Sequence, residues 1–385
     1  MSKIITLTGE ISPDELGFTS MHEHINADAK GLALVLLKSV FSTMKGSTAY
    51  QKGADIGAER ARRQKLQISL PAMSMNGVLS SMKVKKGNPA GKLGFQEYYG
   101  NEFQAFRACG GQSICDCSPL PFRGASMKEN RQLSLTTGVQ VISAAGFYIK
   151  AAISGRDAAS GEAGMQAKIE HTLEYGDGTC DAKPGFVKAA LGTIADDAIV
   201  PVELAAVKAA ARAAKNAHTS LHIHNAFPVR KSMILGVADL LEKEIGIAPD
   251  KVIFCHMDSY NLGSGNPAAV VNEHGWDLSL PTELCRRGFN VGLDTWGIGG
   301  GPSALYDFNL NSRREMLLAL IDLGFGGQIT LGHDMMSKGS GVQNGGSGYV
   351  LWPKTLTEMT ARGEISKEMF HTLTVETPAR ILAID

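Results

Sequence analysis

The chain lacks an excess of either charge. Lys and Arg together number 38 among 385 residues, and Asp and Glu also number 38, so the formal net charge at pH 7 is zero. This balance leaves no overall field that would draw the protein onto nucleic acid or an anionic membrane, although it does not exclude a local basic patch. We therefore expect neither nucleic acid nor membrane as a partner.

Long hydrophobic runs are also absent. The longest, Leu32 to Leu37, is too short to span a bilayer and ends at Lys38. The first residues, MSKIITLTGEISPDELG, have no apolar core behind their lysine and do not resemble a secretory signal. We expect a cytoplasmic protein.

Cysteine is scarce, and its six copies fit reduced, buried thiols better than a disulfide framework. Cys115 and Cys117 alternate with Asp116 in a strand-like run, which favours a strand over a zinc-binding pair. The hydrophobic content of 44% is enough for a large core. One large α/β domain over residues 1–385 is predicted, with two domains as the alternative.

Short apolar runs rich in β-branched residues alternate with longer segments of helical period, the pattern of parallel βα units. Helices are predicted over Pro201 to Ala217 and Asn311 to Leu323. Eight strands with helices between them favour a (β/α)8 barrel (TIM barrel) over a doubly wound sheet. The predicted strands are Phe18 to His24, Ser113 to Ser118, Val139 to Tyr148, Phe186 to Leu191, Ser220 to His224, Val252 to His256, Phe289 to Thr295 and Ile329 to Asp334.

The connection after the first predicted strand is much longer than a βα crossover needs. We interpret residues 31–105, which include Lys83 to Lys86 and the glycines of Gly87 to Gly94, as an inserted helical subdomain. It could cover the barrel mouth or form an oligomer contact, and a partly mobile decoration is the alternative.

Histidines and an aspartate end several of these strands. His22 and His24 form an H-x-H whose alternation puts both side chains on one face, while His224, His256 and Asp334 end the fifth, sixth and eighth strands. Each alone has an ordinary interpretation as a hydrogen-bonded core or rim residue. Active sites of barrels form at the carboxyl ends of the strands, so their shared position favours a site for zinc or a similar cation.

Lys188 lies inside the apolar fourth strand, GFVKAAL, where an unpaired ammonium would be costly to bury. One interpretation is an acidic partner elsewhere in the chain. The other is that the neutral amine adds carbon dioxide to give N6-carboxylysine, a carbamate able to bridge two cations.

Several motifs together resemble the phosphotriesterase-like family of the amidohydrolase superfamily: LGFTSMHEHI, VQVISAAGFY, PGFVKAAL, ITLGHDMM, GGSGYVLWP and TVETPARILAI. The likeness covers nearly the whole chain except the insertion. It implies a binuclear metal centre in which His22, His24 and Asp334 hold the buried ion and His224 and His256 the more exposed one. A carboxylated Lys188 and a hydroxide would bridge the two ions, most simply zinc, with Mn, Co, Fe or Ni as alternatives.

Two histidines depart from this ligand set. His222 lies two residues before His224 on the same strand face, so it is either a supporting group or an alternative ligand. His333, next to Asp334, should point away from the site and is expected to be structural.

The resemblance implies a metal-dependent hydrolase acting on a small molecule. Asp334 is expected to move the proton from the attacking water to the leaving group, with Lys188 and His256 as further catalytic groups. We prefer a lactonase acting on a sugar-derived lactone, phosphorylated or carboxylated. Phosphotriester, carboxylester or amide hydrolysis is the alternative within the superfamily, and a non-catalytic metal-containing binding protein is the alternative of another class. A homodimer is compatible with the sequence.

Candidate substrate contacts follow the strands. The cations Arg123, Lys150 and Lys338 could bind a carboxylate or phosphate, or each could be a solvated rim charge. Tyr148 and Trp296 could form pocket walls or cap the core. The glycine-rich stretch Gly297 to Gly301 matches no phosphate-binding fingerprint and is interpreted as a flexible loop.

Overall fold

The computed structural model describes residues 2–27, 87–119, 122–226, 229–258, 278–296 and 310–384. Within them, eight parallel strands pair in chain order to form one sheet. All eight were predicted from the sequence, with bounds that differ by a few residues. They are β3 (Thr19–Glu23), β4 (Ser113–Asp116), β5 (Gln140–Gly146), β6 (Phe186–Leu191), β9 (Leu221–Asn225), β10 (Val252–Phe254), β11 (Asn290–Leu293) and β12 (Ile329–Leu331).

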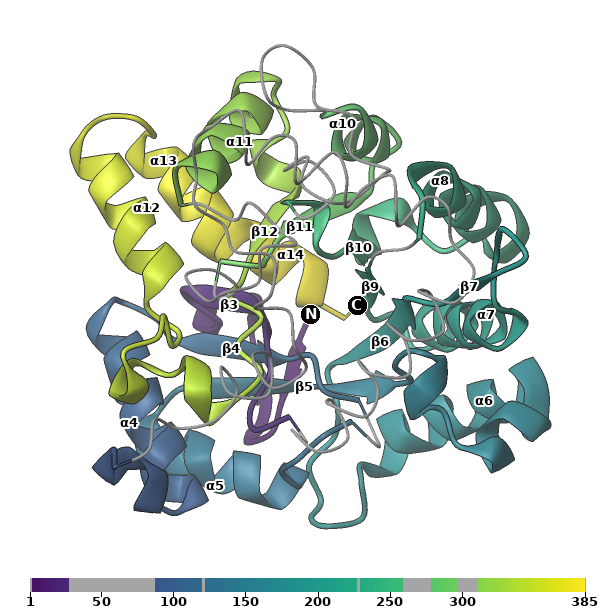
Figure 1. Ribbon diagram of the computed structural model, residues 1–385, viewed down its shortest axis with the longest axis horizontal. Coiled ribbons are helices and arrows are strands. Elements are labelled where there is room, and N and C mark those ends of the chain that lie inside the picture. The colour runs from purple at the N-terminus through teal and green to yellow at the C-terminus, as the bar shows by residue number, and fades with distance from the viewer. Residues whose placement is uncertain are drawn as a thin grey trace.

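The sheet closes on itself. An isolated parallel bridge between His22 and Gly332 links its two edge strands, β3 and β12. Figure 1 looks into the resulting ring, and the helices lie around its outside. A closed parallel sheet surrounded by helices is the predicted (β/α)8 barrel.

Alternation along the strands divides the apolar side chains between the interior and the outer layer. In β5, Ile142 and Ala144 pack in one cluster with Cys115 and Phe186 of the neighbouring strands, whereas Ala145 packs in the large cluster that includes residues of the helices. Successive side chains of a strand point to opposite faces. The first cluster therefore fills the barrel below the strand ends.

Ten α-helices are described, and the two predicted from the sequence are confirmed: α7 (Pro201–Asn216), which begins with a proline in its first turn, and α11 (Leu310–Asp322). The others are α4 (Phe95–Ala108), α5 (Met127–Thr137), α6 (Gly155–Tyr175), α8 (Lys231–Leu240), α10 (Ser279–Arg286), α12 (Leu351–Ala361), α13 (Lys367–His371) and α14 (Thr377–Leu382). None of the helices in these ranges is long and apolar enough to cross a membrane.

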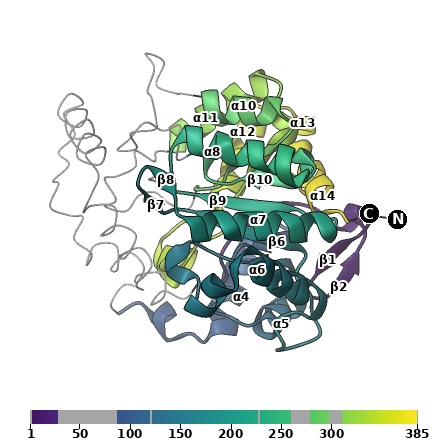
Figure 2. The same cartoon turned by 90° about the vertical axis from the view of Figure 1, so that its right-hand side faces the viewer.

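Short helical turns complete the connections: η1 (Pro13–Glu15), η3 (Pro89–Lys92), η4 (Lys150–Ala152), η5 (Leu241–Ile245), η6 (Pro249–Lys251), η7 (Gly326–Gln328), η8 (Lys338–Ser340), η9 (Val342–Asn344) and η10 (Thr372–Glu376). Two small hairpins were not predicted: β1 (Ile4–Thr6) with β2 (Gly9–Ile11), and β7 (Ile194–Ala195) with β8 (Ala198–Ile199). The first hairpin and the two chain ends lie at the end of the barrel where the strands begin (Figure 2), and a bridge joins Lys3 to Ile384.

Most of the predicted insertion, residues 31–86, lies outside the described residues. Its last part includes η3 and most of α4, which packs against α5 and leads into β4. Since α4 occupies the place of the helix between the first two barrel strands, we propose that the added segment ends before Phe95.

Candidate metal centre

The carboxyl ends of the strands bring all six predicted ligands together. His22 and His24 come from the end of β3, Lys188 from β6 and His224 from β9, while His256 and Asp334 follow β10 and β12. Short contacts connect neighbouring members of this group, and all six side chains are largely buried. The predicted convergence at one end of the barrel is therefore a feature of the structure.

Three of these residues form a group that could hold a cation. The Nε2 atom of His24 lies 3.0 Å from Asp334 Oδ1, and Nε2 of His22 lies 3.6 Å from the same oxygen. The Nδ1 atoms point elsewhere, to Ser118 Oγ for His24 and to Asp294 for His22, at 2.8 Å each. Two imidazole nitrogens and one carboxylate oxygen, all within 4.8 Å of one another, fit zinc or another first-row divalent ion.

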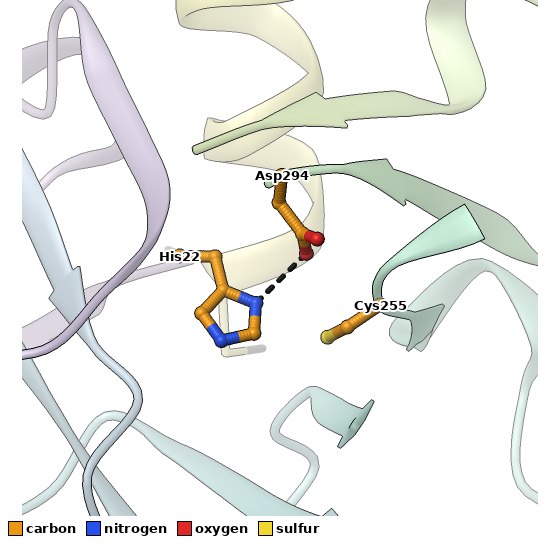
Figure 3. Close-up of side chains that lie close together, drawn as sticks. All are labelled: His22, Cys255 and Asp294. Carbon is orange, nitrogen blue, oxygen red and sulfur yellow. Dashed lines mark hydrogen bonds and ion pairs between the residues drawn. The ribbon is translucent and has the colours of Figure 1, made fainter. Parts of the chain in front are cut away.

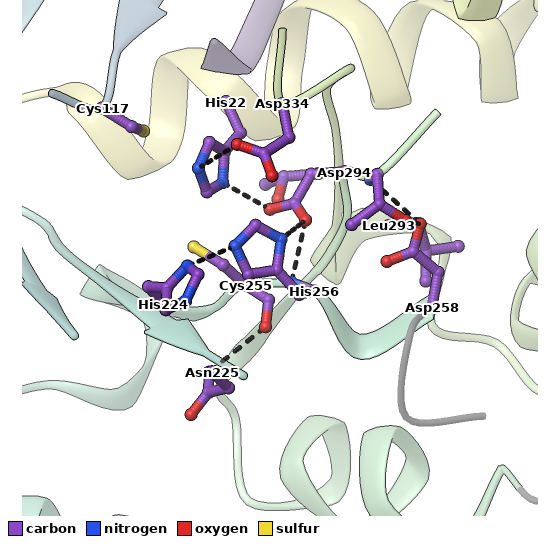
Figure 4. A network of polar contacts seen from close by, with 12 residues as sticks. His22, Cys117, His224, Asn225, Cys255, His256, Asp258, Leu293, Asp294 and Asp334 are labelled. Atoms are coloured by element: carbon purple, nitrogen blue, oxygen red, sulfur yellow. Dashed lines mark hydrogen bonds and ion pairs between the residues drawn. The ribbon is translucent and has the colours of Figure 1, made fainter. Parts of the chain in front are cut away.

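A second pair of donors lies beside this group. Nε2 of His256 is 2.7 Å from Nδ1 of His224, and the His256 ring is 4.7 Å from the His22 ring between centroids. Figure 4 shows the imidazoles of His22, His224 and His256 converging on one region, with Asp334 on the far side of His22. The donors thus form two adjoining sets.

Lys188 is completely buried and lies where the two sets meet. Its Nζ atom is 3.3 Å from His22 Nε2 and 3.6 Å from the Cys255 thiol. No carboxylate within the described ranges forms an ion pair with it, so the acidic partner considered from the sequence is not found there. Burial opposes the charged form of the Lys188 amine, whereas the nearby Cys117 and Cys255 thiols and the Asp294 and Asp334 carboxylates raise its pKa.

Backbone conformation explains how two of the ligands reach the site. In β10, Phe254 faces the outer cluster and Cys255 the inner one, so continued alternation would turn His256 outward. Instead His256 has φ +62°, and Asp334 has φ +55°. This left-handed conformation is uncommon for residues other than glycine, and it directs the His256 ring toward His22 and His224.

Asp294 is a site residue that the sequence analysis missed. It follows β11, is 1% exposed and contacts two predicted ligands through different oxygens. Oδ2 lies 2.8 Å from Nδ1 of His22 (Figure 3), whereas Oδ1 accepts the backbone N–H of His256 at 2.8 Å and lies 2.8 Å from its Nδ1. The available signal was its position at the carboxyl end of a predicted strand, the same signal that identified Asp334.

Glu23 was also missed. This buried carboxylate accepts hydrogen bonds from Ser20 Oγ, from the backbone N–H of His333 and from that of Met335, and it lies 2.7 Å from His333 Nδ1. His333 and Met335 flank Asp334. Glu23 therefore fixes the backbone that presents Asp334, and His333 has the structural contacts expected of it.

The electrostatic environment favours the neutral, metal-binding form of His22 and His224 and the charged form of His256. Burial, assisted by the Lys188 charge, lowers the pKa of His22 to about 3, and burial beside His256 lowers the pKa of His224 well below its usual value. Burial also opposes the charged form of His256. The charge and the hydrogen bond of Asp294 have the larger effect, so the pKa of His256 is raised. Burial would raise the pKa of Asp294, yet His256 and His22 hold it well below its usual value, so Asp294 is an anion.

His222 lies deeper in the barrel than His224. Its ring stacks on Phe186 at 4.2 Å, its Nε2 lies 3.3 Å from Ser220 Oγ, and its Nδ1 lies 4.0 Å from the Cys117 sulfur. These neighbours belong to the barrel interior rather than to the ligand group, which favours a supporting role for His222.

Two predicted substrate contacts, Tyr148 and Lys150, lie in the connection that follows β5. The Tyr148 hydroxyl is 3.4 Å from His224 Nε2, and its ring stacks on Phe122. Lys150 follows β5 at the start of η4 and is exposed, while its backbone N–H is held by the buried Glu203.

The other three predicted substrate contacts are occupied within the protein. Arg123 donates to the carbonyls of Ser118 and Ala144, Lys338 donates to the carbonyl of Leu93, and the Trp296 indole donates to that of Leu293. All five residues of the predicted glycine-rich loop, Gly297 to Gly301, lie outside the described residues.

The fold and this donor set define the class of barrel enzymes that use bound metal ions for hydrolysis. A family model described as the phosphotriesterase family matches residues 2–382, so the chain belongs to that family, as its motifs predicted. It is a metal-dependent hydrolase.

Known relatives cover the chain almost completely. An N-acetyltaurine hydrolase of Xenopus tropicalis is 24% identical over 387 residues, covering 99% of this chain and 97% of the relative. An N-acetyltaurine hydrolase of Dictyostelium discoideum is 23% identical over 402 residues, covering 100% and 98%.

Among solved structures, a resiniferatoxin-binding protein from Rhodobacter sphaeroides has a TM-score of 0.72 at 23% identity, covering 99% of this chain and 94% of the other. A structure from the engineering of organophosphate hydrolysis on a weak promiscuous lactonase template has a TM-score of 0.68 at 19% identity, covering 99% of both chains. These likenesses confirm the barrel fold.

Proposed function

We propose that this hydrolase works with two divalent cations, most simply zinc, with Mn, Co, Fe or Ni as alternatives. His22, His24 and Asp334 would hold one ion, and His224 and His256 the other. The observation that carries the proposal is that the two donor sets adjoin, with His22 and His256 ring centroids 4.7 Å apart and Lys188 Nζ beside His22. One small molecule could therefore reach both ions.

Carboxylation of Lys188 would complete the centre. The neutral amine attacks carbon dioxide, a nitrogen–carbon bond forms, and one proton is released, which leaves an anionic carbamate at the end of the side chain. Its support is the burial of Nζ at the junction of the donor sets without an ion-pair partner among the described residues. The carbamate would bring two oxygens and a negative charge to that junction.

The cations would supply an acidified water and polarise the oxygen of the substrate. Asp334 is the group proposed to accept the proton of that water and deliver it to the leaving group. Burial opposes the charged form of Asp334, but the His24 hydrogen bond and the neighbouring imidazoles lower its pKa, so the carboxylate is ionised at neutral pH. His256, bonded to Asp294, extends the proton path, and the Tyr148 hydroxyl is available to donate to the substrate.

We propose a sugar-derived lactone with a phosphate or carboxylate as the substrate. Lys150, exposed at the start of η4 in the connection after β5, is the cation best placed to meet such a group. Hydrolysis of an N-acyl amine is the second candidate, favoured by the two N-acetyltaurine hydrolases that match the whole chain. The anionic lactone and N-acetyltaurine each have an acyl carbon that water can attack and a negatively charged group that Lys150 could bind. Phosphotriester or carboxylester hydrolysis is a further alternative, and the cytoplasmic location and the homodimer stay predictions.

Kinetics on metal-loaded protein would separate these activities. The panel contains a sugar-acid lactone with and without its phosphate, N-acetyltaurine, a neutral N-acetyl amine, an aryl ester and a phosphotriester. We expect the highest kcat/KM on the anionic lactone, and Lys150→Met should lower it for the anionic lactone but not for the neutral one. A higher kcat/KM on N-acetyltaurine would favour the second candidate. Two bound ions without turnover of any substrate would favour a non-catalytic binding protein.

A further inference from the structure

We propose that Asp294 is a positioning residue that fixes the tautomers of His22 and His256 and thereby connects the two ion sites. The inference rests on the proposed metal centre. It concerns one buried carboxylate that contacts one histidine of each donor set through its two different oxygens.

The geometry determines where the ring protons lie. An ionised carboxylate only accepts hydrogen bonds, so at 2.8 Å from Asp294 the Nδ1 atoms of both His22 and His256 must carry the hydrogen. When a ring is neutral, its Nε2 atom then keeps the lone pair. Those Nε2 atoms face the proposed ion positions, near Asp334 for His22 and near His224 for His256.

A comparison with His24 shows why Asp294 is special. The Nδ1 atom of His24 meets a hydroxyl, Ser118 Oγ, at 2.8 Å. A hydroxyl can donate or accept, so Ser118 accommodates either tautomer of His24. The carboxylate of Asp294 removes that freedom for two proposed ligands at once, His22 and His256.

The backbone makes the effect of an amide substitution directional. Oδ1 of Asp294 also accepts the backbone N–H of His256, a donor that cannot change its role. In Asp294→Asn the amide oxygen must therefore stay on the His256 side, which places the amide NH2 against Nδ1 of His22. His22 then has to accept at Nδ1 and carry its proton on Nε2, which blocks metal binding by that ring.

The expected result is a selective loss. Loss of a carboxylate partner of a metal-binding histidine lowers metal affinity by about 10- to 100-fold. We expect Asp294→Asn to weaken the ion held by His22, His24 and Asp334 by this factor, while the ion at His224 and His256 keeps affinity close to that of the wild type. Competition with a chromophoric chelator measures both affinities.

The tautomers can be read without metal and without activity. In metal-free protein labelled with ¹⁵N-histidine, the imidazole ¹⁵N shifts identify the protonated nitrogen, and His22→Gln and His256→Gln assign the signals. The wild type should carry the hydrogen on Nδ1 in both rings, and Asp294→Asn should move it to Nε2 in His22 alone. A neutral ring that carries its hydrogen on Nε2 in the wild type would overturn the inference even if the variant failed to fold.

Glu203→Gln provides the matched control. Glu203 is another fully buried carboxylate near the strand ends, but it accepts the backbone N–H groups of Lys150, Gly192 and Thr193. The Glu203→Gln variant should leave the affinities for both ions and the tautomers of His22 and His256 unchanged. A wild-type protein without bound ions would refute the metal centre itself, whereas a wild-type and an Asp294→Asn protein with equal affinities for two ions would refute only the role of Asp294.

Discussion

Replacing Glu23 by glutamine tests whether a carboxylate outside the ligand set holds Asp334 in place. Oε1 of Glu23 accepts hydrogen bonds from Ser20 Oγ and the His333 backbone N–H and lies 2.7 Å from His333 Nδ1, while Oε2 accepts the backbone N–H of Met335 at 3.3 Å. In Glu23→Gln the amide NH2 replaces Oε2, because three donors compete for the remaining oxygen. One hydrogen bond is lost and two donors face each other beside Asp334.

The structure gives the size of the expected effect. Leaving a buried backbone donor unsatisfied costs about 1–3 kcal/mol. An unfolding entropy of about 2.1 cal/mol/K per residue gives roughly 0.8 kcal/mol/K for 385 residues. The melting temperature of the metal-free protein should therefore fall by about 1–4 °C, which differential scanning calorimetry can resolve.

The same substitution should also weaken metal binding, because Asp334 depends on this backbone for its left-handed conformation. Glu102→Gln is the control. Glu102 is a buried carboxylate that accepts the backbone N–H groups of Val342 and Gln343, so its loss should lower stability similarly without changing metal affinity. The reasoning is wrong if Glu23→Gln melts and binds metal as the wild type does.

Three further predictions concern the site and the closure of the barrel. Lys188→Ala should lose both ions and the activity, as measured by metal analysis and turnover, and two retained ions with normal rates would refute the bridging role. Tyr148→Phe should lower kcat/KM by about 2- to 13-fold, the value of a neutral hydrogen bond, with unchanged metal content; an unchanged kcat/KM would remove its hydroxyl from the mechanism. Gly332→Ala would place a Cβ 2.5 Å from the carbonyl oxygen of His22. It should cost about 1–3 kcal/mol in urea unfolding, and a stability equal to the wild type would contradict the close approach.

The barrel and its donor set could be predicted because both are local signals. Runs such as SLHIH and VIFCH combine β-branched or apolar residues with a polar residue at the end, and parallel strands end on one rim. The interactions that organise the site could not be predicted this way. His22 and Asp294 are 272 positions apart, and nothing near either residue indicates a 2.8 Å contact.

Two further features could not be predicted from the sequence: the backbone conformation of His256 and the end of the inserted segment. Strand alternation would turn His256 away from the site, but His256 has a left-handed conformation and its backbone N–H donates to Asp294. Most of the segment Phe95–Ala108 fell inside the predicted insertion, residues 31–105, because the long connection hid its boundary. In the structure it is α4, which leads directly into the second barrel strand.

The central claim is that His22, His24, Lys188, His224, His256 and Asp334 bind two ions. Anomalous diffraction from crystals of the active protein, collected on both sides of the metal absorption edges, tests it most directly. We predict two peaks, one between His22, His24 and Asp334 and one at His224 and His256, with density extending from Lys188 Nζ between them. Fully active crystals with no anomalous peak among these side chains would contradict the account.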